Sequence, residues 1–146
     1  MWPVDPIPDE DRLYFRIHKK TFLLNNPERP PASAFTNTPK EGDNISTDWS
    51  KYATPEQCRE LVSKMVNAKG VPKNPNDYSV YSFGVGDVRN MKSITPEVLH
   101  DPIYNEPEIP GQPNNRAHSI IKTSRTGNDP RFRMELVELG HWKIRL

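Results

Sequence analysis

The sequence predicts an α+β domain: a small, mostly antiparallel sheet with one main amphipathic helix and long proline-rich loops. The chain holds 16 prolines in 146 residues, roughly twice the usual share of about 5%. Most lie in residues 3–8, 27–39 and 102–113. Proline fixes φ and lacks an N–H, so these stretches are neither central strands nor helix interiors. The segments between them show no βαβ repeat, which favours α+β over α/β.

Two strands are expected in the first third of the chain. Residues 12–18 (RLYFRIH) are rich in aromatic and β-branched side chains, which favour strands. Residues 44–49 (NISTDW) predict a second, shorter strand. Between them, residues 19–43 are irregular, with a short extended piece that brings Phe35 into the core. Alternation along the first strand separates Leu13, Phe15 and Ile17 on one face from Tyr14, Arg16 and His18 on the other.

The clearest helical signal covers residues 54–69. Thr54 is a predicted N-cap, Pro55 takes the first helical position and Gln57 completes a capping box. Gly70 is expected to stop the helix. We expect this to be the longest helix, with a buried stripe at helical spacing: Cys58, Leu61, Val62, Met65 and Val66.

The second half of the chain adds shorter elements. Strands are expected at residues 78–85, 98–100, 116–124 and 142–146, and a turn at residues 126–130. Residues 86–91 predict one helical turn capped by Asp87. Residues 130–139 predict a helix after the Asp129 cap, although the same residues also alternate as a strand. Of these six candidate strands we expect four or five to form, together with two helices.

Composition limits the class of protein. Residues 1–11 predict an extended proline-rich lead and residues 12–146 a single domain. One cysteine cannot form an internal disulfide, and no apolar run approaches the ~20 residues of a membrane span. The net charge of +1 gives no field for non-specific nucleic-acid binding. We therefore expect a soluble cytoplasmic protein with neither nucleic acid nor membrane as partner.

A series of different short motifs occurs along residues 12–123. They are Arg16-Ile17-His18, Ala32-Ser33-Ala34-Phe35, Ile45-Ser46-Thr47-Asp48, Thr54-Pro55-Glu56, Gly86-Asp87-Val88-Arg89, Asp101-Pro102 and Ala117-His118-Ser119. In this order they resemble a group of small, uncharacterised bacterial proteins. The resemblance implies a bacterial source and a single folded domain, and no activity, ligand or fold.

No residue pattern identifies a chemistry. Cys58 lies on an apolar helix stripe, which indicates core packing rather than a nucleophile. The histidines lack metal-ligand spacing, so no metal or cofactor is expected; a site across loops at His100, Asp101 and His118 is the alternative. Gly84-Val85-Gly86 indicates a turn rather than a phosphate-binding loop, because Arg89 stands where the third glycine would be.

An enzyme is the alternative function. Arg16 followed by Ser46-Thr47 is similar to the order in ADP-ribosyltransferase-like folds, where an arginine grips the dinucleotide phosphates. Asp48 stands where the third member of that Ser/Thr motif would be. This alternative is a small toxin-like or nucleotide-processing enzyme with Arg16, Ser46 and His118 around one pocket. The polar face of residues 12–18 is equally typical of a solvated sheet face.

The favoured hypothesis is a small non-catalytic binding module that acts through a protein partner. Long proline-rich loops offer docking surfaces, and tryptophans are frequent anchors of interfaces. The expected binding residues are Trp2, Tyr14, Arg16 and Trp49, with both tryptophans exposed. His118 is expected to pin a loop by hydrogen bonding a carbonyl or carboxylate, with Arg16 and Asp101 as partners.

Overall fold

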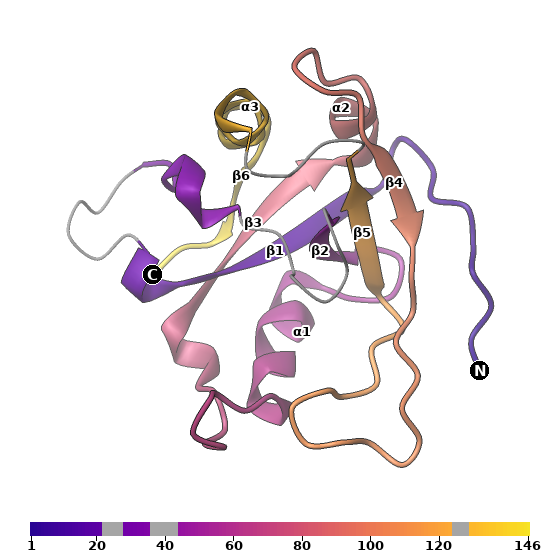
Figure 1. The fold of residues 1–146 in the computed structure, drawn as a ribbon, viewed down its shortest axis with the longest axis vertical. Coiled ribbons are helices and arrows are strands. Elements are labelled where there is room, and N and C mark those ends of the chain that lie inside the picture. The colour runs from indigo at the N-terminus through magenta and orange to yellow at the C-terminus, as the bar shows by residue number, and fades with distance from the viewer. Residues whose placement is uncertain (22–27, 36–43, 124–128) are drawn as a thin grey trace.

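A six-stranded antiparallel sheet organises the chain (Figure 1). The computed structural model describes residues 1–21, 28–35, 44–123 and 129–146. The sheet order is β4-β5-β2-β1-β3-β6, and every pair is antiparallel. The α+β prediction is confirmed, with six strands instead of four or five. The strands are β1 Arg12–His18, β2 Asn44–Trp49, β3 Tyr78–Gly84, β4 Glu97–His100, β5 His118–Lys122 and β6 His141–Ile144.

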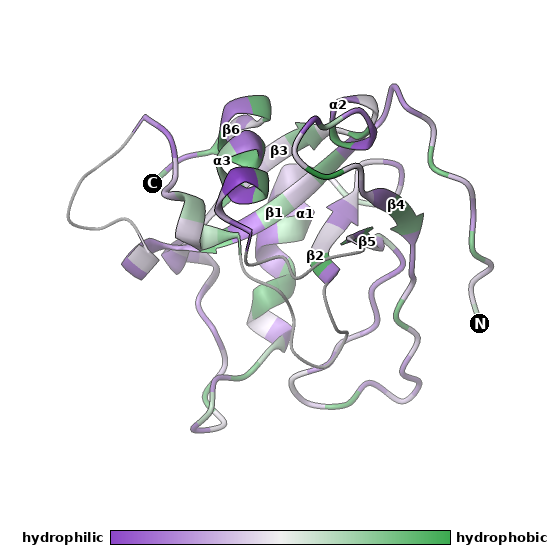
Figure 2. Cartoon of the chain, turned by 45° about the horizontal axis from the view of Figure 1, so that its top comes forward, coloured by the Kyte–Doolittle hydropathy of each residue, from purple (hydrophilic) through white to green (hydrophobic). Residues whose placement is uncertain are grey.

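In the part of the chain that the structure describes, three α-helices cover the two faces of this sheet. They are α1 Pro55–Glu60, α2 Val85–Arg89 and α3 Pro130–Leu139. Side chains of α2 and α3 join the main hydrophobic core, whereas Cys58 of α1 packs with Tyr14 and Val80 on the opposite face. Figure 2 shows hydrophilic and hydrophobic segments on both α2 and α3, as expected of helices with one buried side.

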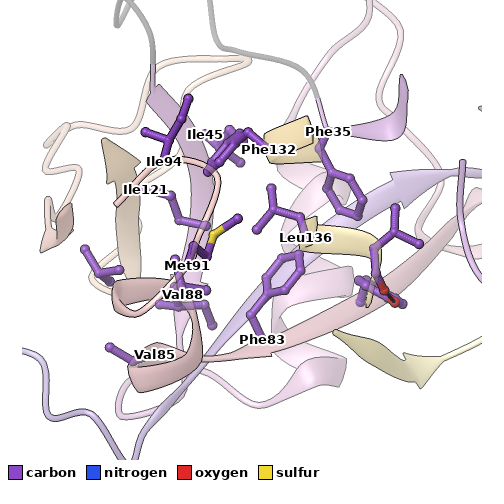
Figure 3. Packing of buried hydrophobic residues seen from close by; sticks show 14 of the residues in the cluster. Phe35, Ile45, Phe83, Val85, Val88, Met91, Ile94, Ile121, Phe132 and Leu136 are labelled. Carbon is purple, nitrogen blue, oxygen red and sulfur yellow. Dashed lines mark hydrogen bonds between the residues drawn. The ribbon is translucent and has the colours of Figure 1, made fainter. Parts of the chain in front are cut away.

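The main core lies between the sheet and α3. Phe35, Phe83, Phe132 and Leu136 are each fully buried, and Figure 3 shows them grouped between the helix and the strands. Residues Ala32–Ala34 form a 3-10 turn, so the expectation of an extended piece there is wrong, but the expectation that Phe35 docks into the core is confirmed.

Gly140 ends α3 where there is no room for a side chain. A Cβ there would lie 2.3 Å from Cε2 of Tyr81. This close approach lets the chain turn directly from α3 into β6, which pairs with β3.

The predicted helix over residues 54–69 is shorter than expected. The capping box of Thr54 and Gln57 is present, but α1 ends at Glu60 and continues only as a 3-10 turn, Leu61–Lys64. Met65 is extended, and the side chain of Asn67 accepts from the N–H groups of Lys69 and Val71. Such local hydrogen bonds compete with helix propagation. The longest helix is therefore α3.

The predicted apolar stripe is only partly buried for the same reason. Cys58 and Val62 are each 1% exposed. Three other members of the stripe are half-buried: Leu61, Met65 and Val66. Leu61 begins the 3-10 turn, and Met65 and Val66 come after it, so none of the three belongs to α1. They form part of a groove described below.

The remaining elements lie close to their predicted ranges. Asp129 caps α3 as expected, so the strand alternative for these residues is wrong. Gly84 occupies the N-cap of α2 without a side-chain bond, so the predicted Asp87 cap is wrong. Most of the predicted turn at residues 126–130 lies outside the described residues.

The N-terminal lead, residues 1–11, runs alongside β4 in space (Figure 1). Its Ile7 is buried in the main core, and Asp5 donates a backbone hydrogen bond to Nδ1 of His100. Arg89 of α2 holds the lead through the carbonyl of Ile7 and the carboxylate of Asp9. Within the described residues, no helix has both the length and the apolar character needed to cross a bilayer.

Candidate functional site

A groove of about 690 Å³ lies over the face of the sheet that α1 covers. One wall is apolar and comes from Leu61, Met65 and Val66 at and beyond the end of α1. The opposite wall belongs to the segment of residues 102–115, here called the arm, which contributes Ile103 and Ile109. The two walls are therefore far apart in sequence and meet only in the fold.

The arm is a narrow hairpin held by its own bridges. Ile103 pairs with Asn115, and Ile109 pairs with Gln112. Gly111 turns the tip with φ +87°, and a Cβ there would lie 3.1 Å from Val66. Glycine suits both requirements, since it tolerates positive φ and a close approach.

Two contacts outside the groove support the arm. Near the tip, Lys64 and Glu108 form an exposed ion pair at 3.3 Å. Near the base, the ring of Trp2 meets that of Tyr104 edge-on, with centroids 5.2 Å apart.

The floor of the groove is polar because of strand register. Tyr14 is opposite Asp48, and Asp48 is opposite His118. Since side chains alternate along a strand, Arg16 and Ser46 share the face of these three residues. The structure thus brings Arg16, Ser46 and His118 to one groove, as the enzyme alternative expected.

A buried ion pair anchors Arg16. Its Nη1 atom donates to Oδ2 of Asp48 at 2.7 Å and to the Cys58 carbonyl at 3.0 Å. The second oxygen of Asp48 accepts from the amide of Asn115 at 2.8 Å. Burial by itself lowers the pKa of Arg16, but the adjacent Asp48 carboxylate outweighs it and raises that pKa above its ordinary value. Arg16 therefore stays charged in a site that is electrically balanced.

Arg16 retains unused donors. Within the described residues, every hydrogen bond of its guanidinium is made by Nη1. A guanidinium has five N–H donors in a rigid fork, so Nε and Nη2 remain available. The side chain is 17% exposed and lines the groove.

His118 links the floor to the base of the arm. Its Nδ1 atom lies 2.7 Å from the carbonyl oxygen of Asp101, and its Nε2 lies 3.2 Å from Oγ of Ser46. The carbonyl can only accept, so Nδ1 donates to it, and in the neutral ring Nε2 then accepts from the serine hydroxyl. The carboxylate of Asp101 also lies 3.5 Å from Nδ1. The expected contact between His118 and Asp101 is confirmed. The expected contact between His118 and Arg16 is wrong, because Arg16 bonds Asp48 instead.

The other expected binding residues lie away from the groove surface. Trp49 is 1% exposed and donates to Asp11 at 2.8 Å, so the expectation that it is exposed is wrong. It belongs to β2, which lies inside the sheet between β5 and β1, and its ring packs edge-on against Tyr52 and His100. Trp2 is half-buried against the arm, so the expectation that it is exposed is wrong as well.

Tyr14 lies beneath α1 with Cys58 and Val80. Burial raises the pKa of both Tyr14 and Cys58. Because Tyr14 is buried and Arg16 nearly so, the interpretation of this strand face as solvated is also wrong.

Metal ligands do not gather in the part of the chain that the structure describes: no group of three His, Cys, Asp or Glu side chains converges there. His100 uses both ring nitrogens, accepting from the N–H of Asp5 and contacting the carbonyl of Arg116 at 2.7 Å. It stacks on Tyr52 and has a structural role in holding the lead.

Sequence reasoning missed Asp48 and Asn115 as members of the floor. Asp48 was noted only as a departure from a serine motif. The signal that could have identified Asp48 is a carboxylate on the polar face of one strand near an arginine on the neighbouring strand. Asn115 is the last residue of the arm, whose position is set by non-local contacts.

In comparisons with known proteins, no family model, curated protein or solved structure matches the chain. Its own geometry is therefore the basis for assigning a function.

Proposed function

We propose that this protein is a small non-catalytic binding module and that the groove takes a segment of a protein partner. The segment would place an apolar side chain between the walls and an acceptor oxygen toward Arg16. The observation that carries the proposal is the pairing of two apolar walls with unused guanidinium donors on the floor.

The size and polarity of the groove support this function. A volume of about 690 Å³ falls within the roughly 300–1,000 Å³ of ligand sites, which combine apolar lining with few polar groups. The floor carries no net charge, because Asp48 balances Arg16 at 2.7 Å. A carbonyl or a single carboxylate is thus a better match than a highly charged group.

A peptide selection tests the proposal. Random peptides displayed on phage would be selected against the protein and then measured by calorimetry. Ile109→Asp changes an arm residue that is 53% exposed, and Met134→Asp changes a residue of α3 that is 52% exposed. We expect at least about tenfold weaker binding for Ile109→Asp and unchanged binding for Met134→Asp. Equal effects of both variants, or no selectable peptide, would contradict the proposal.

One contact favours a second candidate function, an enzyme that uses Arg16, Ser46 and His118. A hydroxyl that donates to a histidine, as Ser46 does at 3.2 Å, is the arrangement that activates serine nucleophiles. The Arg16–Asp48 pair weighs against a grip on dinucleotide phosphates, since the charge is already balanced. Two assays test the enzyme: release of nicotinamide from NAD, and labelling of Ser46 by a fluorophosphonate. A positive result in either would support an enzyme, and negative results in both would favour the binding module.

The compartment is part of the same proposal. Cys58 is an unpaired thiol, which is typical of proteins in a reducing compartment. The motif resemblance implies a bacterial source. We accordingly place the module in the bacterial cytoplasm.

A further inference from the structure

A second hollow, of about 610 Å³, shares none of its lining residues with the groove. It lies where β1 ends, between the 3-10 turn Lys19–Thr21 and the loop that leads into β3. Both segments lie at the left and lower left of Figure 1. Neither the binding module nor the enzyme alternative uses it.

The loop that forms one side of this hollow is internally bonded. Val66 pairs with Pro72, and Lys73 donates its N–H to the carbonyl of Met65 at 2.9 Å. Gly70 turns the loop with φ +77°, a conformation that glycine adopts without strain. The backbone of this loop is therefore held in place before any ligand binds.

The polar side chains around the hollow have already used their acceptor atoms. Oδ1 of Asn67 accepts from Lys69 and Val71, and Oδ1 of Asn74 accepts from Asn76 at 2.9 Å. Each amide is left with its NH₂ group, which only donates.

His18 follows the same pattern. Its Nδ1 accepts from the N–H of Lys20 at 3.0 Å, so the neutral ring carries its proton on Nε2. The hollow is therefore lined mainly by hydrogen-bond donors, with few acceptors left to compete for them.

The charge of the hollow is also one-sided. Three lysines and one carboxylate line it: Lys19, Lys20, Lys73 and Asp77. Lys19 pairs with Asp77 at 2.9 Å. Among the described residues, neither Lys20 nor Lys73 has a carboxylate within ion-pair distance. Within the described ranges, these two positive charges therefore have no balancing carboxylate.

From this arrangement we infer that the hollow binds a phosphate group carried by a small molecule. A phosphate supplies several strong acceptor oxygens and about two negative charges, which matches a set of donors with two uncompensated lysines. This site differs from the groove, whose floor is electrically balanced and whose walls are apolar.

The ionisation of His18 reports on this site. Burial lowers the pKa of His18 below its ordinary value, and the charges of Lys20, Lys19 and Lys73 lower it further while Asp77 opposes them. An anion in the hollow would favour the protonated ring, so it would raise the pKa of His18. The ring of Tyr78 meets that of His18 edge-on and adds no charge.

The test is a titration of the isotope-labelled protein with inorganic phosphate and with pyrophosphate, followed by NMR. We expect saturable shifts at Asn67, Lys73 and Asn74 and a raised pKa of His18. The variant Lys20→Gln/Lys73→Gln should weaken binding about tenfold or more. Lys92→Gln/Lys122→Gln removes equal charge from residues that do not line the hollow, and should bind as the wild type does.

Three results would overturn the inference. They are the absence of saturable shifts up to about 20 mM phosphate, equal weakening in both double variants, and a pKa of His18 that phosphate leaves unchanged. Stronger binding of pyrophosphate than of inorganic phosphate would indicate a ligand with more than one phosphate group. Equal binding would indicate a single phosphate group.

Discussion

Arg16 and Asp48 form a 2.7 Å ion pair between neighbouring strands. The pair fixes the guanidinium at the bottom of the groove and leaves its Nε and Nη2 donors unused by the described residues. It also explains why a strand face rich in polar groups lies beneath α1 instead of in water.

Loss of the Asp48 charge should destabilise the fold. Asp48 is 1% exposed, and its variant Asp48→Asn leaves Arg16 buried without a counter-charge. We expect a loss of about 3 kcal/mol in the free energy of unfolding, measured with urea. Lys64→Gln is the control, because it breaks a pair that is exposed on both sides and should cost less than about 1 kcal/mol. Equal losses would show that the Arg16–Asp48 pair has no special role.

His118→Ala should also lower thermal stability. The ring is 3% exposed and joins Asp101 to Ser46, so its removal deletes both contacts and leaves a space where the buried ring packed. We expect a loss of about 1–3 kcal/mol, and a smaller loss for Ser46→Ala, which leaves the bond from His118 to Asp101 in place. The contrary result is a His118→Ala protein of wild-type stability that has lost a ligand or an activity, which would favour the enzyme.

Cys58 should resist alkylation in the folded protein. It is 1% exposed, and burial raises the pKa of its thiol, so little thiolate is present at neutral pH. Labelling with iodoacetamide, followed by mass spectrometry, should be slow without urea and fast in urea. Fast labelling of the native state would mean that α1 opens readily from the sheet.

Two leucines provide a matched test of the core. Leu136 of α3 is fully buried, whereas Leu61 is half-buried at the groove. Leu136→Ala should cost about 2–5 kcal/mol and Leu61→Ala clearly less, since the cost rises with the cavity left behind. A larger loss at Leu61 would indicate that α1 covers a core of its own.

The strands could be predicted because their signal is local. Alternating apolar residues with β-branched side chains mark β1 and β2, and both have the predicted bounds. The helix was overextended because Leu61, Met65 and Val66 keep helical spacing after the chain has left the helix. The competing signal was Asn67, whose side chain bonds its own loop.

The site was harder to predict because its parts are distant in sequence. Alternation placed Arg16 on a polar face but did not show that α1 covers this face. Trp49 was expected to be exposed because composition does not reveal that β2 is central. The arm contacts Val66 and the sheet through tertiary packing, which a single sequence does not encode in any short motif.

The most direct test of the groove is chemical-shift mapping with a peptide from the selection described above. Binding should move the Nε–H resonance of Arg16 and the backbone resonances of Ser46, Ile109 and His118, while those of α3 stay in place. Shifts that cluster on α3 or β4, with Arg16 unchanged, would show that the groove is not the binding site.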